Sequence, residues 1–267
     1  MCGTCGCNEA TIRGGGAEAA AARGAPAEIA PSPTRQLTLQ RRLLERNDLQ
    51  AAANRHHFEQ HGLLALNLLS APGSGKTALL EQLAARWSRP PVGVIVGDLA
   101  TDNDARRLQA AGARAVQIRT GDLCHLEAHL VERAFAQLDA TGMELLVIEN
   151  VGNLVCPTGF DLGEHLRLAV LSVTEGEDKP LKYPGLFRSA DAVLLNKIDL
   201  AEAVDFRRDE ALANLAAIAP RARLFEVSAR SGAGLAELIG WLEQQRRQRG
   251  LQARAHQHGH GSSHVHG

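Results

Sequence analysis

The sequence predicts an α/β domain whose mostly parallel sheet is covered by helices on both faces. Two observations carry this prediction. Short aliphatic runs alternate with amphipathic segments along most of the chain, as they do in sheets built from repeated strand–helix–strand units. The runs are continuously apolar, which is typical of parallel strands that are buried on both faces.

An N-terminal helix is expected first, at Arg35–Gln60, because leucines recur there at near-helical spacing. The seven aliphatic runs that predict strands are Leu63–Leu69, Val92–Val96, Ala115–Ile118, Leu145–Ile148, Leu168–Val173, Ala192–Leu195 and Leu224–Val227. Helices are expected between most of them, at Ala78–Trp87, from about Ala105, and at Leu123–Ala140, Glu202–Ile218 and Leu235–Arg247.

Composition divides the chain into four parts. Residues 1–7 hold three cysteines, and residues 8–35 are rich in Ala, Gly and Pro. The latter segment predicts a flexible linker, since little in it can offset the entropy of ordering the chain. The folded domain is expected at residues 36–249. Residues 250–267 form a His-rich tail that is expected to be disordered.

Charge and cysteine content exclude several classes of protein. Lys and Arg number 29 against 30 Asp and Glu, so no global field favours nucleic acid or an anionic membrane as a partner. No apolar run approaches the roughly 18 residues of a membrane helix, and the first residues lack a signal-peptide pattern. Five cysteines are too few for a disulfide scaffold here. We therefore expect a cytoplasmic protein.

A phosphate-binding loop, Ser70-Ala-Pro-Gly-Ser-Gly-Lys-Thr77, lies between the first expected strand and a helix. Its glycines let backbone N–H groups face phosphates, its lysine reaches the terminal phosphates, and its threonine hydroxyl suits Mg²⁺. Ser70 replaces the first glycine of the usual pattern, which leaves the cradling glycines in place. The predicted nucleotide-binding residues of this P-loop are Gly73, Ser74, Gly75, Lys76 and Thr77.

A base-reading motif, Asn196-Lys-Ile-Asp199, follows the sixth expected strand. A carboxylate at its last position can accept hydrogen bonds from the ring N–H and the exocyclic amine of guanine, whereas adenine offers no such pair of donors. The two residues that follow the seventh expected strand, Ser228 and Ala229, fit the remaining loop around the base. We therefore predict GTP and GDP as the nucleotides, bound through Asn196, Lys197, Asp199, Ser228 and Ala229.

Magnesium and switch residues are expected where two further strands end. Asp98 ends the second strand, and Asp98 and Thr77 are the predicted Mg²⁺ ligands. The segment Glu149-Asn-Val-Gly152 ends the fourth strand, where many GTPases carry Asp-x-x-Gly, and offers an acidic group and a glycine N–H for the γ-phosphate. The predicted catalytic residues are therefore Lys76, Thr77, Asp98, Glu149 and Gly152.

Two acidic residues in the loop after the second strand, Asp102 and Asp104, fit two interpretations equally well. They are either part of the metal and switch region or an ordinary start of the helix near Ala105. No residue in the sequence has the pattern of a catalytic base or an arginine finger. We therefore expect slow hydrolysis.

Three cysteines at the N-terminus predict a metal site. Cys2, Cys5 and Cys7 are close enough for all three sulfurs to reach one ion, and the α-amino group of Met1 is a fourth donor if the methionine is retained. Three thiolates and a nitrogen suit either planar Ni²⁺ or tetrahedral Zn²⁺.

A second metal site is predicted beside the nucleotide loops. Cys124-His125 follows the third expected strand at the start of a helix, and Cys156 lies four residues past Gly152. Both cysteines leave the sheet at the edge that carries the nucleotide loops, which favours a metal site over two small buried apolar side chains.

The C-terminal tail carries five further imidazoles, which are expected to buffer metal, with an inert tail as the alternative. These are His256, His258, His260, His264 and His266.

Together these motifs resemble the HypB family, the GTPases that help to insert nickel during maturation of [NiFe]-hydrogenase. The resemblance spans about residues 36–245 and the first seven. The segments that carry it are Cys-x-x-Cys-Gly-Cys, the P-loop, Gly121-Asp-Leu-Cys-His, Glu149-Asn-Val-Gly-Asn-Leu-Val-Cys-Pro, Glu175-Gly-Glu-Asp-Lys-Pro-Leu-Lys-Tyr-Pro and Asn-Lys-Ile-Asp.

This resemblance implies a SIMIBI-class NTPase fold and a GTP-dependent homodimer. It also implies a high-affinity Ni²⁺ site at Cys2, Cys5 and Cys7, and a weaker Ni²⁺ or Zn²⁺ site at Cys124, His125 and Cys156. The implied partners are a HypA-type zinc metallochaperone, the hydrogenase large-subunit precursor and a SlyD-like nickel donor. The His-rich segment is C-terminal here, whereas family members that have one usually carry it near the N-terminus, so the resemblance does not assign its role.

The sequence therefore predicts a GTP-hydrolysing nickel metallochaperone whose nucleotide state is coupled to metal binding and dimerisation. Two alternatives stay open: a nickel storage or buffering protein, and a nickel-delivery GTPase for another enzyme such as urease. The N-terminal cysteines and the Glu149–Gly152 turn argue against the urease type.

Overall fold

The protein is described by a computed structural model that covers residues 33–89, 91–98, 103–121 and 123–250, with side chains from residue 41 onward. The chain divides into two compact units, Met1–Glu45 and Arg46–Gly267. The described part of the first unit is the beginning of helix α1 (Pro33–Gln60). The N-terminal cysteine site, Asp102 and the histidine tail, as well as the side chain of Asp98, lie outside what is described.

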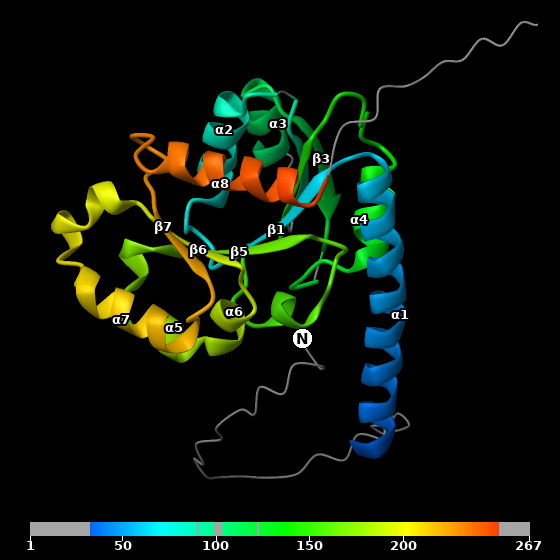
Figure 1. Cartoon of the computed structure of the whole chain (residues 1–267). Helices are drawn as coiled ribbons and strands as arrows, with labels where there is room; N and C mark the ends of the chain where they lie inside the picture. The colour runs from blue at the N-terminus through cyan, green and yellow to red at the C-terminus, as the bar shows by residue number, and fades with distance from the viewer. Residues whose placement is uncertain (1–32, 90, 99–102, 122, 251–267) are drawn as a thin grey trace, which may run out of the picture. The chain divides into compact units, whose positions relative to one another are not determined.

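Seven parallel strands form one sheet in the second unit (Figure 1), in the spatial order β3-β2-β4-β1-β5-β6-β7. Each expected strand is present, which confirms the predicted fold class. The chain order reverses around β1, which lies between β4 and β5, and ligands of such sheets bind where strand order reverses. The strands are β1 (Leu64–Ser70), β2 (Gly93–Asp98), β3 (Arg114–Arg119), β4 (Leu145–Glu149), β5 (Leu166–Ser172), β6 (Ala192–Asn196) and β7 (Arg223–Glu226).

Helices cover both faces of this sheet, as the continuous apolar strands require. The helices α2 (Lys76–Arg86), α3 (Asn103–Ala110) and α8 (Leu235–Gln248) contribute to one large core cluster. On the other face, α1 and α4 (Ala128–Phe135) form a second cluster, and α6 (Pro184–Arg188) and α7 (Arg208–Ile218) form a third. A short helix, α5 (Lys179–Lys182), precedes α6.

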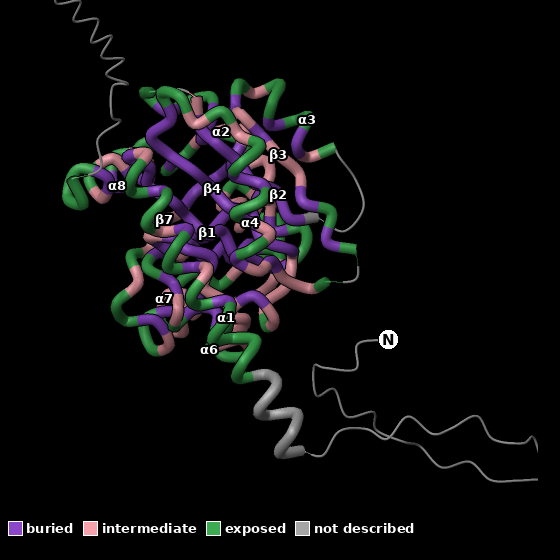
Figure 2. The backbone as a smooth tube through the Cα atoms, turned by 90° about the vertical axis from the view of Figure 1, so that its right-hand side faces the viewer, coloured by how far each residue is buried: buried purple, intermediate pink, exposed green. Residues whose placement is uncertain are grey.

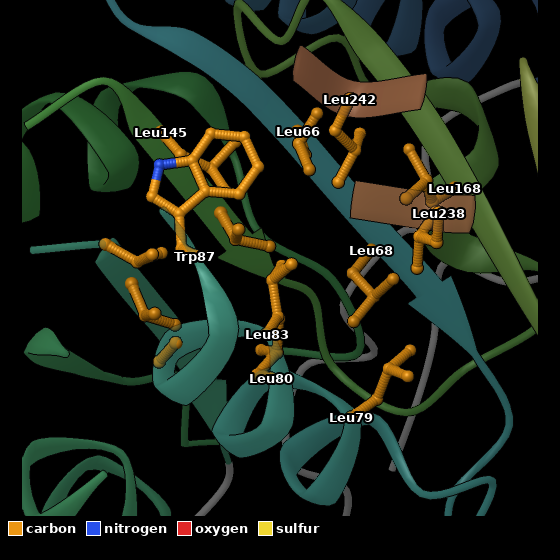
Figure 3. Close-up of a cluster of buried hydrophobic side chains, with 14 of the residues drawn as sticks. Leu66, Leu68, Leu79, Leu80, Leu83, Trp87, Leu145, Leu168, Leu238 and Leu242 are labelled. Atoms are coloured by element: carbon orange, nitrogen blue, oxygen red, sulfur yellow. The ribbon is translucent and has the colours of Figure 1, made fainter. Parts of the chain in front are cut away.

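The aliphatic core follows from the scarcity of aromatic residues. Figure 3 shows Trp87, at the end of α2, among leucines from α2, α8 and the strands. Figure 2 shows that the central strands are almost wholly buried, while most exposed residues lie on the helices and loops around them. The two edge strands, β3 and β7, are only partly buried. Among the described helices, none is both long and apolar enough to cross a membrane.

Two helix predictions are wrong in extent. The segment Leu123–Ala140 is helical only at Ala128–Phe135, because Asn150 Oδ1 accepts from the N–H of Leu126 at 3.2 Å and Asn47 Oδ1 accepts from that of Ala128 at 2.9 Å. Cys124 and His125 therefore lie in a loop rather than at the start of a helix.

The second correction concerns Glu202–Ile218. A short 3₁₀ turn at Glu202–Val204 ends at Asp205, which has the left-handed φ of 49°, and α7 begins only at Arg208. A left-handed residue cannot continue a right-handed helix, so the predicted helix is interrupted there.

Candidate nucleotide site and metal-binding segment

The P-loop leaves the end of β1 and leads into α2, as the sequence predicts. Gly73 and Gly75 have left-handed φ angles of 73° and 96°, which glycine adopts without strain. A Cβ atom at Gly75 would also lie 2.7 Å from Asn196 Nδ2. Both conformation and space therefore require glycine at this position.

Ser70 has a role that the sequence did not reveal. Its hydroxyl accepts from Lys76 Nζ at 2.8 Å and from Ser74 Oγ at 2.6 Å. Ser70 is fully buried and Lys76 is 8% exposed. The residue that departs from the usual glycine thus positions the lysine inside the loop.

The base-reading motif is bonded directly to the P-loop. Asn196 Nδ2 donates to the Ser74 carbonyl at 2.9 Å, and Lys197 Nζ donates to the Gly73 carbonyl at 2.7 Å. Lys197 itself has a φ of 61°. Asn196 and Lys197 therefore fix the distance between the phosphate end and the base end of the site.

The last residue of this motif belongs to the base end. Asp199 Oδ1 accepts from Ser228 Oγ at 2.6 Å, and the Ala229 N–H donates to Asn196 Oδ1 at 3.2 Å. The structure thus brings all five predicted base-contacting residues together, with the Asp199 carboxylate oriented by a hydroxyl group.

The Glu149–Gly152 turn packs against the P-loop. Thr77 Oγ1 donates to Glu149 Oε1 at 3.0 Å, and Glu149 is 5% exposed. A Cβ atom at Gly152 would lie 3.1 Å from the Pro72 backbone. Asp98 ends β2, the strand that pairs with β4 through Val96 and Glu149.

A cavity of about 360 Å³ opens between these segments, within the range of small-molecule sites. Its lining comes from the P-loop, β2, α3 and the Glu149–Gly152 turn: Pro72, Gly73, Gly75, Lys76, Thr77, Ala78, Val96, Gly97, Asp104, Arg107, Glu149, Asn150, Val151 and Gly152.

Arg107 of α3 is a cavity residue that sequence reasoning missed. Its guanidinium binds Glu81 of α2 through two contacts of 2.9 Å and lies 3.4 Å from Asp104. The hydrogen bond that Arg107 donates to Glu81, with further attraction from nearby carboxylates, raises the pKa of Arg107. Only its helical spacing from Asp104 could have drawn attention to it.

Cys124 and His125 form the described core of the second predicted metal site. Cys124 Sγ lies 3.6 Å from His125 Nδ1, and the imidazole stacks on Phe160 with ring centroids 3.9 Å apart. The imidazole Nε2 is buried without a hydrogen-bond partner among the described residues. Burial lowers the pKa of His125, against the attraction of Glu127, so its neutral, metal-binding form is favoured.

Cys156 lies apart from that pair. It begins a 3₁₀ turn, Cys156–Gly159, and Asn153 Oδ1 accepts from its backbone N–H at 3.1 Å. Within the part of the chain that the structure describes, no three His, Cys, Asp or Glu side chains converge on a common metal position. The structure thus brings two of the three predicted ligands together.

Asn150 joins the Glu149–Gly152 turn to the loop that carries Cys124 and His125. It is fully buried, and its Oδ1 accepts from the N–H of Leu126 at 3.2 Å and from that of Val151 at 2.9 Å. Its Nδ2 donates to Asn67 Oδ1 of β1 at 3.3 Å. One side chain therefore links the residue after His125 to the turn that carries Glu149.

Several known proteins resemble this chain. The family described as CobW/HypB/UreG, nucleotide-binding domain, matches residues 64–226. The hydrogenase maturation factor HypB of Azotobacter chroococcum is 44% identical over 96% of this chain and 95% of its own length. The hydrogenase/urease maturation factor HypB of Helicobacter pylori is 41% identical over 78% of this chain and 87% of its own.

A solved structure of a relative has a similar fold. The crystal structure of HypB from Helicobacter pylori in complex with nickel matches with a TM-score of 0.74 and 39% identity, covering 79% of this chain and 99% of that one.

Proposed function

The chain belongs to the HypB family of the CobW/HypB/UreG nucleotide-binding proteins, and we propose that it is a GTP-hydrolysing nickel metallochaperone. It assists insertion of nickel into the large subunit of [NiFe]-hydrogenase. Nickel is the cargo of this process, and the nucleotide state controls how the cargo is held. The relatives' role in hydrogenase maturation and the nickel bound by the Helicobacter pylori protein support the proposal.

The choice of GTP rests on Asp199. Ser228 donates to one of its carboxylate oxygens, which orients the carboxylate as an acceptor for the paired N–H donors of guanine. An adenine ring would leave this acceptor without those donors, at a cost of about 1–3 kcal/mol.

Lys76 and the P-loop N–H groups bind the phosphates. Thr77 and Glu149, whose oxygens are 3.0 Å apart, would hold Mg²⁺ together with Asp98, because these oxygen donors are the ligands that Mg²⁺ prefers. When bound, Mg²⁺ neutralises charge on the phosphates. Arg107 reaches the cavity wall but is held by Glu81, which is consistent with slow hydrolysis.

Coupling between nucleotide and metal is carried by Asn150. The Glu149–Gly152 turn contacts the P-loop through Thr77, and Asn150 bonds the same turn to the backbone beside His125. A change in this turn when the γ-phosphate binds or leaves is therefore transmitted to Cys124 and His125. Cys156 follows the turn directly in sequence, so the same change alters where it can reach.

The metal sites differ in role. The N-terminal cysteines, Cys2, Cys5 and Cys7, hold Ni²⁺ with high affinity, and Cys124, His125 and Cys156 form a weaker site for Ni²⁺ or Zn²⁺. Thiolate and neutral imidazole suit both ions. The third ligand joins when the turn rearranges or when two protomers meet in a GTP-dependent homodimer.

The partners that follow from this role are a HypA-type metallochaperone, the hydrogenase large-subunit precursor and a SlyD-like nickel donor. All of these encounters take place in the cytoplasm. The near-neutral chain recognises them through surface shape and metal chemistry rather than through bulk charge.

The coupling is tested in a full-length protein with serine at Cys2, Cys5 and Cys7. Titration with Ni²⁺ in GDP and in a non-hydrolysable GTP analogue, followed by the Ni²⁺–thiolate absorption band, isolates the second site because imidazoles of the tail give no such band. The two affinities should differ by about 5- to 150-fold. Equal affinities in the two nucleotide states would sink the coupling proposal.

Asn150→Ala in the same background should bring that affinity ratio close to one, while lowering stability by about 1–3 kcal/mol because buried polar groups lose partners. Asn214→Ala is the matched control, since Asn214 makes one bond to the Glu177 carbonyl away from the site. It should keep the wild-type ratio.

A second candidate is delivery of nickel to urease as well, which the name of the Helicobacter pylori relative favours. Maturation of both enzymes in cells that lack this chain, with and without complementation, distinguishes the two roles. A storage role for the tail predicts instead that deleting residues 250–267 lowers nickel capacity per chain and leaves hydrogenase activity unchanged in nickel-replete cells.

A further inference from the structure

Two histidines outside the sites above lie at the end of helix α1: His57 is in its last turn, and His61 follows its last residue. His57 and His61 are one helical turn apart, and their Nε2 atoms lie 3.2 Å from each other. The ring centroids are 5.0 Å apart. His57 is exposed and His61 is half-buried, so the pair lies at the surface of the protein.

This separation suits two ligands of one transition metal. Histidine nitrogens bind such ions at about 2.0–2.1 Å, and ligand angles of about 90° to 109° then place two nitrogens about 2.9–3.4 Å apart. The observed 3.2 Å lies inside that range. The same four-residue spacing on a helix supplies the two histidines of the HExxH metal sites.

Neighbouring residues hold the two rings in place. Both rings pack against Phe135 of α4 in T-shaped arrangements, with centroid distances of 5.2 Å for His57 and 5.6 Å for His61. Phe135 is 4% exposed. Asn54, almost one turn before His57, is buried and donates to the Ala128 carbonyl at the start of α4 at 2.8 Å. Binding an ion therefore costs little rotamer freedom in these side chains.

We propose that His57 and His61 form a two-histidine site for a divalent transition metal of the Ni²⁺ and Zn²⁺ type, with water as the remaining ligands. Imidazole is a preferred ligand of these ions, whereas Mg²⁺ prefers oxygen. The site uses no cysteine and does not depend on nucleotide. It is therefore separate from the proposed metallochaperone sites and stands or falls independently of them.

His56 provides an internal control. It is exposed on the same helix, but its Nε2 lies 2.9 Å from Gln60 Nε2. Its partner is therefore a side-chain amide rather than a second imidazole. It has one imidazole where the proposed site has two, so its affinity for Ni²⁺ should be that of an isolated surface histidine.

The test is residue-resolved histidine modification with diethylpyrocarbonate on the full chain, read by peptide mass spectrometry with Ni²⁺ or Mg²⁺ present. At a free Ni²⁺ concentration about ten times the dissociation constant, His57 and His61 should react about ten-fold more slowly, with one shared midpoint. His56 should keep its rate, and Mg²⁺ should protect none of the three. Because each histidine is read separately, metal bound elsewhere in the chain does not enter the result.

Substitutions decide whether the two rings act together. His61→Gln should abolish protection of His57, and His57→Gln should abolish protection of His61, while His56→Gln should leave both protected. Protection of one ring that survives loss of the other, or no protection when the C-terminal histidines are already saturated, overturns the proposal. Circular dichroism of each variant verifies that the fold is retained.

Discussion

The nucleotide cradle comprises the P-loop, residues 196–199 and residues 228–229, and the predicted metal-binding segment comprises Cys124, His125 and Cys156. Both lie in loops that follow strands of one sheet, yet they are built differently. In the cradle, Asn196 and Lys197 reach across the chain to two P-loop carbonyls. In the metal-binding segment, Cys124 and His125 are 3.6 Å from each other, His125 stacks on Phe160, and the backbone of Cys156 is bonded to Asn153 in a local turn. The contacts of the cradle are in place in the folded chain, whereas only two of the three predicted metal ligands, Cys124 and His125, lie together among the described residues.

The difference has a physical cause. Phosphates are bound largely by backbone N–H groups, whose positions are set by strand, loop and helix. Thiolate and imidazole ligands are instead side chains, and here they belong to loop residues. The positions of their sulfur and nitrogen atoms are therefore set only when the loops are fixed. This arrangement suits the proposed metallochaperone role, in which the site releases its cargo, because a small change in one loop would alter the ligand set.

The largest expected effect tests the cradle. Lys76→Ala removes the cation that Ser70 holds in the loop, and should lower kcat for GTP hydrolysis by about 10²–10³-fold because transition-state charge loses a preorganised donor. Phosphate release measures this. Metal stoichiometry at Cys2, Cys5 and Cys7 should be unchanged in the same protein. Hydrolysis near the wild-type rate would place the reaction outside the cradle.

The base end of the cradle gives the next effect. Asp199→Asn replaces an acceptor by a donor, so GTP affinity should fall by about 100-fold, as expected for two lost charge-assisted hydrogen bonds, while xanthosine triphosphate, which has a carbonyl in place of the amine, should bind better. Fluorescent-nucleotide competition gives both affinities. Asp205→Asn is the matched control, because asparagine tolerates the left-handed φ of 49° found there. Unaltered preference for guanine in Asp199→Asn would contradict the assigned role.

The metal-binding segment is tested through the ring under His125. Phe160→Leu keeps apolar volume but removes the stack at 3.9 Å, and should weaken Ni²⁺ binding by about 10-fold, the usual cost when a group that orients a ligand is lost. The Ni²⁺–thiolate band measures this. Nucleotide affinity should stay unchanged.

Phe206→Leu makes the same substitution at a partly buried phenylalanine that packs against the third core cluster. It should leave the metal affinity intact. If Phe160→Leu weakened nucleotide binding as much as metal binding, the two regions would not be as separate as their contacts indicate.

The same contrast explains what could be predicted from the sequence. All seven strands were predictable, since continuous aliphatic runs have few alternatives to a buried parallel sheet. The cradle residues were equally predictable, because Gly75 and Asn196 occur in motifs whose local geometry is nearly fixed. The hydroxyl of Ser70 was missed because its contacts with Lys76 and Ser74 exist only in the folded loop.

The metal-binding segment was less predictable for the same reason that it is loosely built. Local pattern favoured a helix over Leu123–Ala140, but Asn47 and Asn150, distant in sequence, bond the N–H groups of Ala128 and Leu126. No local signal contains those contacts. The four-residue spacing of His57 and His61 is visible in the sequence, but their contacts with Phe135 of α4 exist only in the folded chain.

The smallest effect concerns the β-sheet frame that both regions share. His165 precedes β5, and its Nδ1 accepts from the Ala65 N–H of β1 at 2.9 Å. Burial lowers its pKa to about 4, with Glu59 opposing and Arg249 and Arg55 adding to the shift. An ordinary histidine titrates near 6.5. As pH falls below about 6.5 the unfolded chain takes up this proton and the folded chain does not, so stability is lost through that window and is unaffected above it.

His165→Asn keeps an acceptor for Ala65 and removes the titrating group. Between pH 7 and pH 5.5, the free energy of unfolding by urea should fall by about 1 kcal/mol more in the wild type than in the variant. All other titrating groups are common to both proteins and cancel in this difference. An equal fall in the two proteins would mean that His165 is protonated in the folded state as readily as in the unfolded chain. His165 would then not be the group through which acid lowers the stability of the sheet, and any loss of stability at low pH would come from other titrating groups.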